Sequence, residues 1–338
     1  MTANLLDVDN IKVSFKSDEG DVTALDNVSF HIKKGEILGV VGESGCGKSV
    51  TSLSIMRLLG KGGRIFQGNI TYKGKELTAL SEVDMRKIRG NEISMIFQEP
   101  MTSLNPVYTI GNQMIETIRS HLKLNKKEAR DLAIDMLKRV GIPRADTIID
   151  DYPHSLSGGM RQRVMIAMAL VCEPSLLIAD EPTTALDVTI QAQILILMKQ
   201  LIQVSDASIM LITHDLGVIA EMADRVVVMY AGQIIEEADV YTLFDDPKHP
   251  YTQGLLQSIP NMEDKQNNRL ESIPGSVPSL QHMPKGCRFN TRCQYVMEKC
   301  LVDQPELISL SKKHSARCWL LEKDEKPSEI SVHLSLSK

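Results

Sequence analysis

The feature that most constrains this chain is the stretch Gly42–Ser49, which reads Gly-Glu-Ser-Gly-Cys-Gly-Lys-Ser. It matches G-x-x-x-x-G-K-S, the pattern of a phosphate-binding loop. An apolar, strand-like segment at residues 36–41 precedes the loop, and a helix-like segment at residues 49–59 follows it. Phosphate loops occur in this strand–loop–helix context, so the alternative of a chance glycine-rich turn is disfavoured.

The chemistry of this loop suits a bound triphosphate. Glycines let the backbone curl so that its N–H groups converge on the anion, and the next helix directs its positive end there. The Lys48 ammonium can reach the β- and γ-phosphates, and the Ser49 hydroxyl can bind Mg²⁺. Cys46 needs only to be small, and we assign it no chemistry. The predicted nucleotide contacts in this stretch are Gly42, Ser44, Gly45, Cys46, Gly47, Lys48, Ser49 and Val50.

The overall composition limits the class of protein. With 338 residues the chain exceeds one core of average size, so about two or three structural units are expected. A net charge of −5 without a long basic run disfavours binding to nucleic acid or to an anionic membrane. No apolar stretch reaches the roughly 18–20 residues of a membrane span, and the first residues do not read as a secretory signal. We therefore expect a cytosolic chain that meets a membrane only through a partner.

The hydrophobic pattern predicts an α/β chain with a mostly parallel core sheet, because strands alternate with helices. Strands are expected at residues 5–15, 24–32, 36–41, 93–97, 175–181 and 208–213, with hairpins at 64–74 and 225–236. Helices are expected at residues 49–59, 81–90, 110–122, 126–140 and 160–170.

Two adjacent carboxylates, Asp180 and Glu181, end the apolar strand at residues 175–181. In an ATPase with a phosphate loop, Asp180 can hold Mg²⁺ directly or through water, and Glu181 can polarise the attacking water. The alternative is a pair of solvated surface acids, which the buried strand before them disfavours. The strand at residues 208–213 ends at His214, which can contact a γ-phosphate or have a structural role.

Two further features are weaker signals. Phe15 lies just before a turn and can either stack on a nucleotide base or pack at the edge of a sheet. Ser157, Gly158 and Gly159 stand at the start of the helix at residues 160–170, where they can bind an anion or simply cap the helix.

Taken together, these motifs resemble the ATP-binding cassette (ABC) ATPases of membrane transporters over residues 5–245. The resemblance implies a P-loop NTPase core with an antiparallel β subdomain and a helical subdomain. It implies adenine stacking by Phe15, catalytic roles for Glu181, His214 and Gln98, Mg²⁺ contacts from Ser49, Gln98 and Asp180, a signature loop at Ser157, Gly158 and Gly159, and a D-loop at residues 185–187 that ends in Asp187. One departure is Met160, where the signature usually has glutamine.

Within this family the chain is similar to the D-type ATPase subunits of dipeptide and oligopeptide permeases. The segments that carry the similarity are residues 97–106, 152–154, 248–256, 273–278 and 286–293. The resemblance implies peptide import driven by closure of two cassettes on ATP, in which Ser157 and Gly159 serve the partner's ATP. The implied partners are a related F-type ATPase subunit, two polytopic permease subunits and, indirectly, an extracytoplasmic peptide-binding protein, so the chain would lie peripherally at the cytoplasmic face of the membrane.

Three alternatives to peptide import remain open. A nickel or other small-solute importer of the same family would share residues 97–106. A soluble cassette ATPase without a transport role is disfavoured by that loop and by the C-terminal extension. A redox-sensing regulator would depend on the cysteines described next. The expected division is a nucleotide-binding core at 1–97 and 161–245, a helical and signature subdomain at 98–160, and a separate C-terminal extension at 246–338.

Four of the six cysteines lie in this extension, namely Cys287, Cys293, Cys300 and Cys318. The gaps between them contain five, six and seventeen residues, unlike the tight C-x₂₋₄-C pairs of structural zinc sites. Such gaps suit an iron–sulfur cluster, while zinc and free or disulfide-forming thiols are the alternatives. The resemblance points to a [4Fe–4S] cluster with a structural role. The flanking basic residues either offset its charge or are ordinary surface charges; they are Arg288, Arg292, Lys299 and Arg317.

Overall fold

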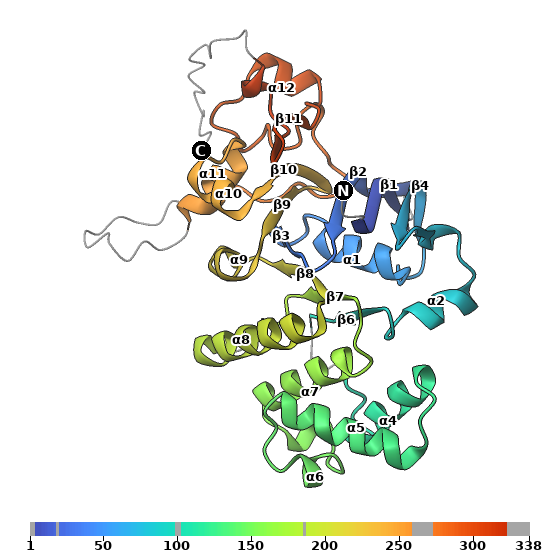
Figure 1. The fold of residues 1–338 in the computed structure, drawn as a ribbon. Coiled ribbons are helices and arrows are strands. Elements are labelled where there is room, and N and C mark those ends of the chain that lie inside the picture. Colours follow the sequence, from blue (N-terminus) through green and yellow to red (C-terminus); the bar gives the residue numbers. More distant parts are fainter. Residues whose placement is uncertain (1–3, 18–19, 99–102, 185–186, 259–272, 323–338) are drawn as a thin grey trace, which may run out of the picture.

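The computed structural model describes residues 4–17, 20–98, 103–184, 187–258 and 273–322 (Figure 1). Three predicted features therefore lie outside the described residues. These are residues 99–102 of the loop after Gln98, residues 185–186 of the expected D-loop, and the polar linker at residues 261–272.

The main sheet has eight strands in the order β11-β12-β10-β9-β3-β8-β7-β6. Its parallel part comprises β6 (Ile93–Ile96), β7 (Leu176–Asp180), β8 (Ser208–Thr213), β3 (Ile37–Val41) and β9 (Arg225–Tyr230). These strands are almost continuous apolar runs, as expected for parallel strands that are covered on both faces. The predicted parallel α/β core is confirmed.

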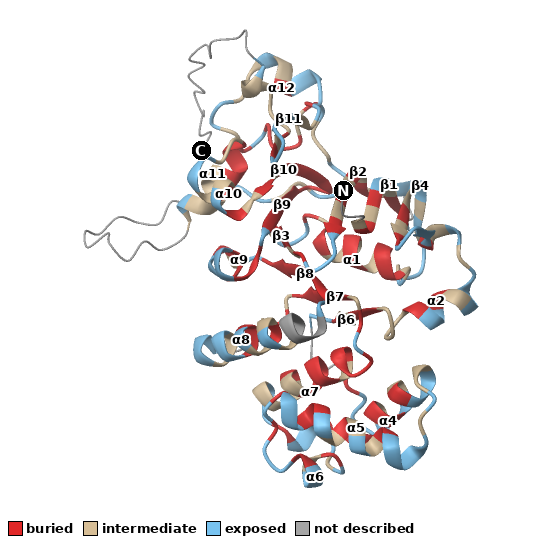
Figure 2. Cartoon of the chain, viewed as in Figure 1, coloured by how far each residue is buried: buried red, intermediate tan, exposed pale blue. Residues whose placement is uncertain are grey.

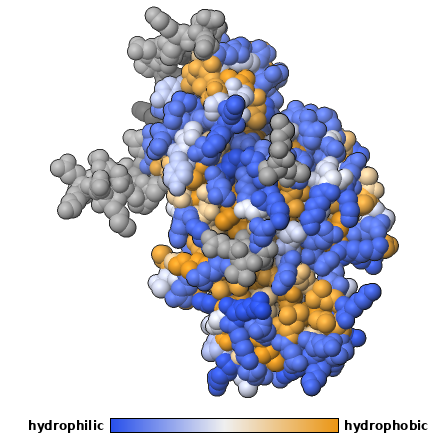
Figure 3. Space-filling view, in the orientation of Figure 1, coloured by the Kyte–Doolittle hydropathy of each residue, from blue (hydrophilic) through white to orange (hydrophobic). Residues whose placement is uncertain are grey.

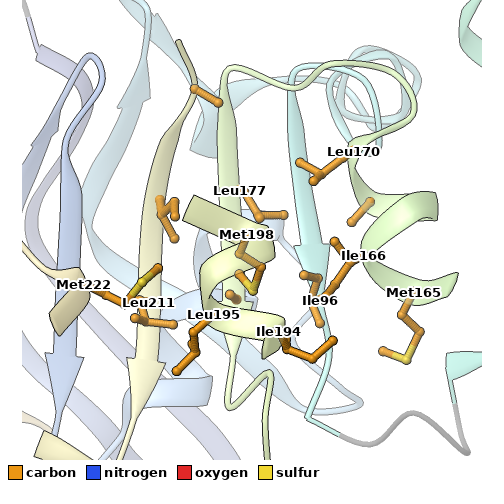
Figure 4. Close-up of a cluster of buried hydrophobic side chains, with 14 of the residues drawn as sticks. Ile96, Met165, Ile166, Leu170, Leu177, Ile194, Leu195, Met198, Leu211 and Met222 are labelled. Atoms are coloured by element: carbon orange, nitrogen blue, oxygen red, sulfur yellow. The ribbon is translucent and has the colours of Figure 1, made fainter. Parts of the chain in front are cut away.

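The two faces of this sheet bury two apolar clusters. On β8, Leu211 faces one cluster and Met210 the other, with the two-residue period of a strand. Helices α7 (Gly158–Leu170), α8 (Val188–Ser205) and α9 (Leu216–Met222) pack on the first face, where Figure 4 shows their apolar side chains meeting the strands. The sheet is thereby fixed from both sides, and its carboxyl edge becomes a rigid platform.

A four-stranded antiparallel sheet, ordered β2-β1-β4-β5, covers the other face together with α1 (Lys48–Met56). Its strands are β1 (Asn4–Ser17), β2 (Gly20–Lys33), β4 (Gly63–Tyr72) and β5 (Lys75–Glu76), and η1 (Leu77–Ala79) and α2 (Glu82–Ile88) follow. The strands predicted at residues 5–15 and 24–32 are confirmed, and β1 and β2 both extend beyond the predicted bounds.

A helical lobe lies beside the sheet edge formed by β6 (Figure 1). It contains α4 (Ile110–His121), α5 (Lys126–Arg139), α6 (Ala145–Ile148), η2 (Pro153–Ser155) and the first turns of α7. Helix α5 begins at a capping box, in which Asn125 accepts from two backbone N–H groups and Glu128 accepts from the Asn125 N–H. Buried residues recur on the inner faces of the lobe, and exposed ones face outward (Figure 2). The helices predicted at residues 110–122 and 126–140 are confirmed. No helix in the described part of the chain is both long and apolar enough to cross a bilayer.

Helix α10 (Val240–Asp245) precedes the C-terminal extension. The described part of the extension contains α11 (Pro250–Gln257), α12 (Glu298–Val302), β11 (Ile308–Ser311), β12 (His314–Ala316) and η3 (Trp319–Leu321). Its two strands join the main sheet, because β12 pairs antiparallel with β10 (Gln233–Asp239). On β10, the fully buried Glu236 carboxylate contacts His314 Nε2 at 2.8 Å and accepts from the backbone N–H groups of Lys248 and His249. This carboxylate joins the extension to the core.

His249 makes the stability of the chain depend on pH. Its buried imidazole caps α11 by accepting from the Tyr251 N–H, and burial lowers its pKa from 6.5 to about 3, aided by the charge of Arg317. Between pH 6.5 and 3 the unfolded chain therefore binds a proton that the folded chain does not. Below pH 6.5 we expect His249 to lower the free energy of unfolding by about 1.4 kcal/mol per pH unit.

The matched variant is His249→Asn, because asparagine can still cap the helix and does not titrate. Urea unfolding at pH 7.0, 6.0 and 5.0 measures the contribution of His249 as the difference between the two pH slopes. Identical slopes for the variant and the unmodified chain would show that His249 does not cause the pH dependence.

Candidate nucleotide-binding site

The phosphate loop joins β3 to the N-terminus of α1. Gly42 has a φ of 151°, and a Cβ there would collide with the Met229 carbonyl, so only glycine fits this position. Gly47, at φ 106°, directly precedes the helix. The buried Lys48 ammonium donates to the carbonyls of Gly42 at 2.7 Å and Glu43 at 3.1 Å. The loop is thus curled around its own lysine, with the helix N-terminus directed into it.

The other predicted residues of the loop lie as its geometry requires. Ser44 and Gly45 are exposed at its tip, and Ser49 and Val50 are partly buried in the first turn of α1. Cys46 is fully buried, and burial raises the pKa of its thiol, in keeping with the absence of an assigned chemical role.

Three neighbouring strands of the sheet deliver polar side chains to the same edge. Gln98 follows β6, Glu181 follows β7 and His214 follows β8, and the carboxyl ends of parallel strands meet at one side of a sheet. Gln98 Nε2 lies 3.2 Å from one Glu181 carboxylate oxygen, and His214 Nδ1 lies 3.4 Å from the other. Thr184 also donates to Glu181, at 2.8 Å. The structure therefore brings the three predicted catalytic residues together around one carboxylate.

The backbone of Glu181 is in an uncommon conformation. Its φ of 48° is left-handed, which costs energy for a residue other than glycine and is frequent at functional sites. Its N–H donates to the Ile212 carbonyl on β8 at 2.9 Å, and this bond fixes the turn. This left-handed conformation begins the turn that directly follows Asp180.

The surroundings of Asp180 suit the predicted role of this residue as a Mg²⁺ ligand. Its carboxylate is almost fully buried, Ser49 and Ser52 hydrogen-bond to it, and its Oδ1 has no hydrogen-bond partner among the described residues. Burial raises its pKa, since a desolvated negative charge is disfavoured. A nearby divalent cation would reverse this preference, and carboxylate and hydroxyl oxygens are the donors that Mg²⁺ prefers. Gln98, the third predicted ligand, instead bonds to Glu181.

The signature residues lie in the helical lobe, away from the phosphate loop (Figure 1). Ser157 caps α7 by accepting from the Met160 N–H, and Asp187 caps α8 by accepting from the Ile190 N–H. Gly158 and Gly159 open α7, and a Cβ on Gly159 would lie 3.1 Å from the Ile190 side chain. Ser157 and Asp187 therefore cap their helices, and Gly158 and Gly159 form the first turn of α7.

Phe15 is partly buried on β1 and packs against the apolar cluster under the antiparallel sheet. A Cβ on its cross-strand neighbour Gly63 would lie 2.7 Å from the Phe15 ring, so the ring fills the space that this glycine leaves. This is the packing role that the sequence left open, and stacking on a base stays a prediction.

The four cysteines of the extension lie close enough for their charges to interact. Burial raises the pKa of Cys293 to about 11 and of Cys318 to about 12, and neighbouring thiolates add to both shifts. Burial raises the pKa of Cys287 as well, and the backbone N–H of Cys287 donates to the Cys300 carbonyl. Nevertheless, no three Cys, His, Asp or Glu residues in the described ranges are arranged to hold a metal. The predicted iron–sulfur site is therefore not confirmed.

Sequence reasoning missed two residues that contact the site. Gln162 is buried on α7 and donates to the Pro182 carbonyl, which links the signature helix to the segment after Glu181. Glu43, a variable position of the phosphate-loop pattern, bonds to residues of the extension. No local pattern signals either contact, because the partners are distant in the sequence.

Comparison with known proteins shows the family. Residues 25–184 match the family described as ABC transporter, and residues 235–300 match the oligopeptide/dipeptide transporter C-terminal region. The oligopeptide transport ATP-binding protein AppD of Bacillus subtilis is 56% identical over 323 residues, which are 95% of this chain and 98% of that protein. The dipeptide transport ATP-binding protein DppD of Escherichia coli is 49% identical, over 93% of this chain and 96% of that one.

A solved structure agrees with these matches. The ATP-binding cassette MJ0796, in a dimeric post-hydrolysis state bound to ADP and Pi, superposes with a TM-score of 0.63 at 28% identity, covering 70% of this chain and 98% of that one. The fold, the residues gathered around Glu181 and the two family matches agree, and the chain belongs to the family of ATP-binding subunits of oligopeptide and dipeptide ABC transporters.

Proposed function

We propose that this chain is the ATP-hydrolysing subunit of an importer of di- or oligopeptides and works at the cytoplasmic face of the cell membrane. The observation that carries the catalytic part is the Glu181 carboxylate, which lies at the carboxyl edge of the sheet with Gln98 and His214 beside it. The peptide substrate is supported by the matched C-terminal region and by the relatives named for peptide transport.

The proposed reaction divides the work among the residues of the site. The N–H groups of the phosphate loop and the Lys48 ammonium bind the triphosphate, while Ser49 and Asp180 hold Mg²⁺. Mg²⁺ supplies neutralisation of the charge on the transferred phosphoryl group. Glu181 accepts a hydrogen bond from the attacking water and takes its proton, and Gln98 and His214 orient Glu181 and the water. Phe15 is proposed to stack on the adenine.

A second cassette is needed to complete the proposed site. Ser157, Gly158 and Gly159 lie in the helical lobe, apart from the phosphate loop of their own chain (Figure 1), and we propose that they serve the ATP of a partner. We propose a related F-type ATPase subunit as this partner, with Asp187 near the interface.

The helical lobe is the proposed contact with two polytopic permease subunits. Figure 3 shows apolar surface over this lobe, and its exposed apolar residues include Val107, Tyr108 and Tyr152. An extracytoplasmic peptide-binding protein would deliver the substrate.

We retain the proposed division into a core at 1–97 and 161–245, a helical and signature subdomain at 98–160, and an extension at 246–338.

Transport by the assembled complex tests this function. The chain, an F-type subunit and two permease subunits are reconstituted in vesicles with a peptide-binding protein, and uptake of labelled peptide and of ⁶³Ni²⁺ is measured. ATP-dependent peptide uptake that is lost with the Lys48→Ala variant supports the proposal. Uptake of nickel alone would identify a metal importer, and a chain that hydrolyses ATP but never associates with permease subunits would identify a soluble ATPase.

For the extension we propose a structural [4Fe–4S] cluster held by Cys287, Cys293, Cys300 and Cys318, with zinc as the alternative. One observation supports an anionic group here. The four thiols lie within reach of each other's charge, and a cluster would keep the thiolates charged despite burial.

The expected result of anaerobic purification is about four irons and four sulfides per chain. Single Cys→Ser changes at positions 287, 293, 300 and 318 should abolish iron binding and lower the melting temperature, because the metal bonds hold the extension together. Cys172→Ser, outside the extension, is the matched control. One zinc per chain, or no metal together with free thiols, would refute the cluster.

A further inference from the structure

We propose that the C-terminal extension positions the phosphate loop for ATP, and that Arg292 is the positioning residue. Arg292 donates to both carboxylate oxygens of Glu43, with Nη1–Oε2 at 2.6 Å and Nη2–Oε1 at 3.0 Å. Glu43 is the second residue of the phosphate loop, and 248 residues separate it from Arg292 in the sequence. A bidentate pair of this kind fixes orientation as well as distance.

The guanidinium of Arg292 is itself held in place. Its side chain is only 3% exposed, its Nε–H donates to the Pro274 carbonyl at 2.8 Å, and Nη2 also donates to the Ile273 carbonyl at 3.3 Å. The cation lies 5.8 Å from the centre of the Tyr230 ring and 5.9 Å from that of Phe289. Because carbonyls of the extension, the Phe289 ring and the Tyr230 ring of β9 together hold the guanidinium, the Glu43 carboxylate is bonded to a fixed partner.

A second contact holds the backbone of the same residue. The hydroxyl of Tyr251, which lies on α11, accepts a hydrogen bond from the Glu43 backbone N–H, with an N–O distance of 2.8 Å. Tyr251 is fully buried and packs with Tyr230 and Phe289, the two rings that also contact Arg292. The extension therefore bonds to both the side chain and the main chain of Glu43.

These contacts affect the geometry at which phosphate binds. The Glu43 carbonyl accepts from the Lys48 ammonium, and the next residues form the tip of the loop. A loop that is already held in its binding conformation loses less freedom when ATP arrives, so its affinity is higher. The pair thus acts on ATP through the loop, without touching the nucleotide.

The competing explanation is that the pair merely anchors the extension. Electrostatics separates the two explanations at Glu43. Removing a negative charge from an anion-binding loop should by itself tighten ATP binding. Positioning predicts the opposite result, because the Glu43→Gln variant loses the bidentate pair and loosens the loop.

The test uses the full-length chain and the assembled transporter. The variants Arg292→Gln, Glu43→Gln and the double variant are compared by the Kd for MgATP, the melting temperature, and the kcat and KM of hydrolysis. We expect each single variant to raise the Kd and the KM for ATP about tenfold, in the range typical of coupled sites, with kcat unchanged. The double variant should be no weaker than the worse single variant, since both break one interaction.

The matched control is Arg130→Gln, which breaks an equally bidentate pair with Asp150 in the helical lobe, at 2.8 and 2.7 Å. It should leave the Kd for ATP unchanged. A folded Glu43→Gln chain that binds MgATP as tightly as, or more tightly than, the unmodified chain overturns the proposal. Should Arg292→Gln fail to fold, Glu43→Gln still decides the question, because Arg292 keeps its carbonyl partners in that variant. Loss of ATP binding by the unmodified chain would instead count against the nucleotide site itself.

Discussion

Replacing Glu181 with glutamine is expected to leave ATP binding intact and to slow hydrolysis about 10²–10⁴-fold, the usual loss when a general base is removed. Glutamine has the size of glutamate and can still bond to Gln98 and Thr184, so the turn after Asp180 should persist. It cannot accept a proton from the attacking water. Turnover is measured in the assembled complex with the partner's site inactivated, and MgATP binding is measured on the same preparation.

Glu82→Gln is the control for this change, because Glu82 is exposed and pairs with Arg89 far from the carboxyl edge of the sheet. It should hydrolyse ATP at the unmodified rate. Near-normal turnover of Glu181→Gln would remove Glu181 from the reaction and leave the role of the strained turn unexplained. Loss of both binding and hydrolysis would indicate instead that the substitution disturbs the loop.

Replacing Glu236 with alanine is expected to lower the free energy of unfolding by about 3–5 kcal/mol, the range found when one partner of a buried pair is removed. The change leaves the His314 imidazole and the N–H groups of Lys248 and His249 buried without their acceptor. Urea unfolding at pH 7.5 measures the loss. Limited proteolysis should show the extension released first.

Two controls accompany this measurement. Glu236→Gln retains an acceptor oxygen and should lose less stability than the alanine variant. Glu322→Ala breaks an exposed pair with Lys299 in the same extension, and its effect should stay within about 0.5 kcal/mol. Equal stability of Glu236→Ala and the unmodified chain would show that β12 pairing, and not this carboxylate, joins the extension to the core.

Local patterns predicted most of the fold. The strand at residues 208–213 is buried at each position and apolar from Ile209 to Ile212, because both faces of the sheet are covered, and such a run is visible in the sequence. The helix at residues 126–140 is visible in the sequence because its apolar residues, which include the buried positions of α5, recur at helical spacing. Helix α8 was not predicted. Strands β11 and β12 were also missed, because they are short and acquire their pairing only beside β10.

The candidate site divides in the same way. The phosphate loop can be recognised in the sequence because its function depends on consecutive residues. The two acids at the end of β7 can be recognised because they directly follow an apolar, strand-like run. The sequence placed Gln98, Glu181 and His214 at the ends of three separate strands, but it could not show that their side chains converge on one carboxylate. Convergence follows from the parallel order of β6, β7 and β8.

The sequence by itself determined the strand–loop–helix around Lys48, the apolar strands and the family, since each depends on the chemistry of neighbouring residues. Only the tertiary structure decided what supports the phosphate loop. Glu43 and Arg292 are 249 positions apart, and the Glu236 contact spans 78 positions to His314. Contacts of this length depend on how sheet and extension pack, because buried polar groups must find partners wherever the fold places them.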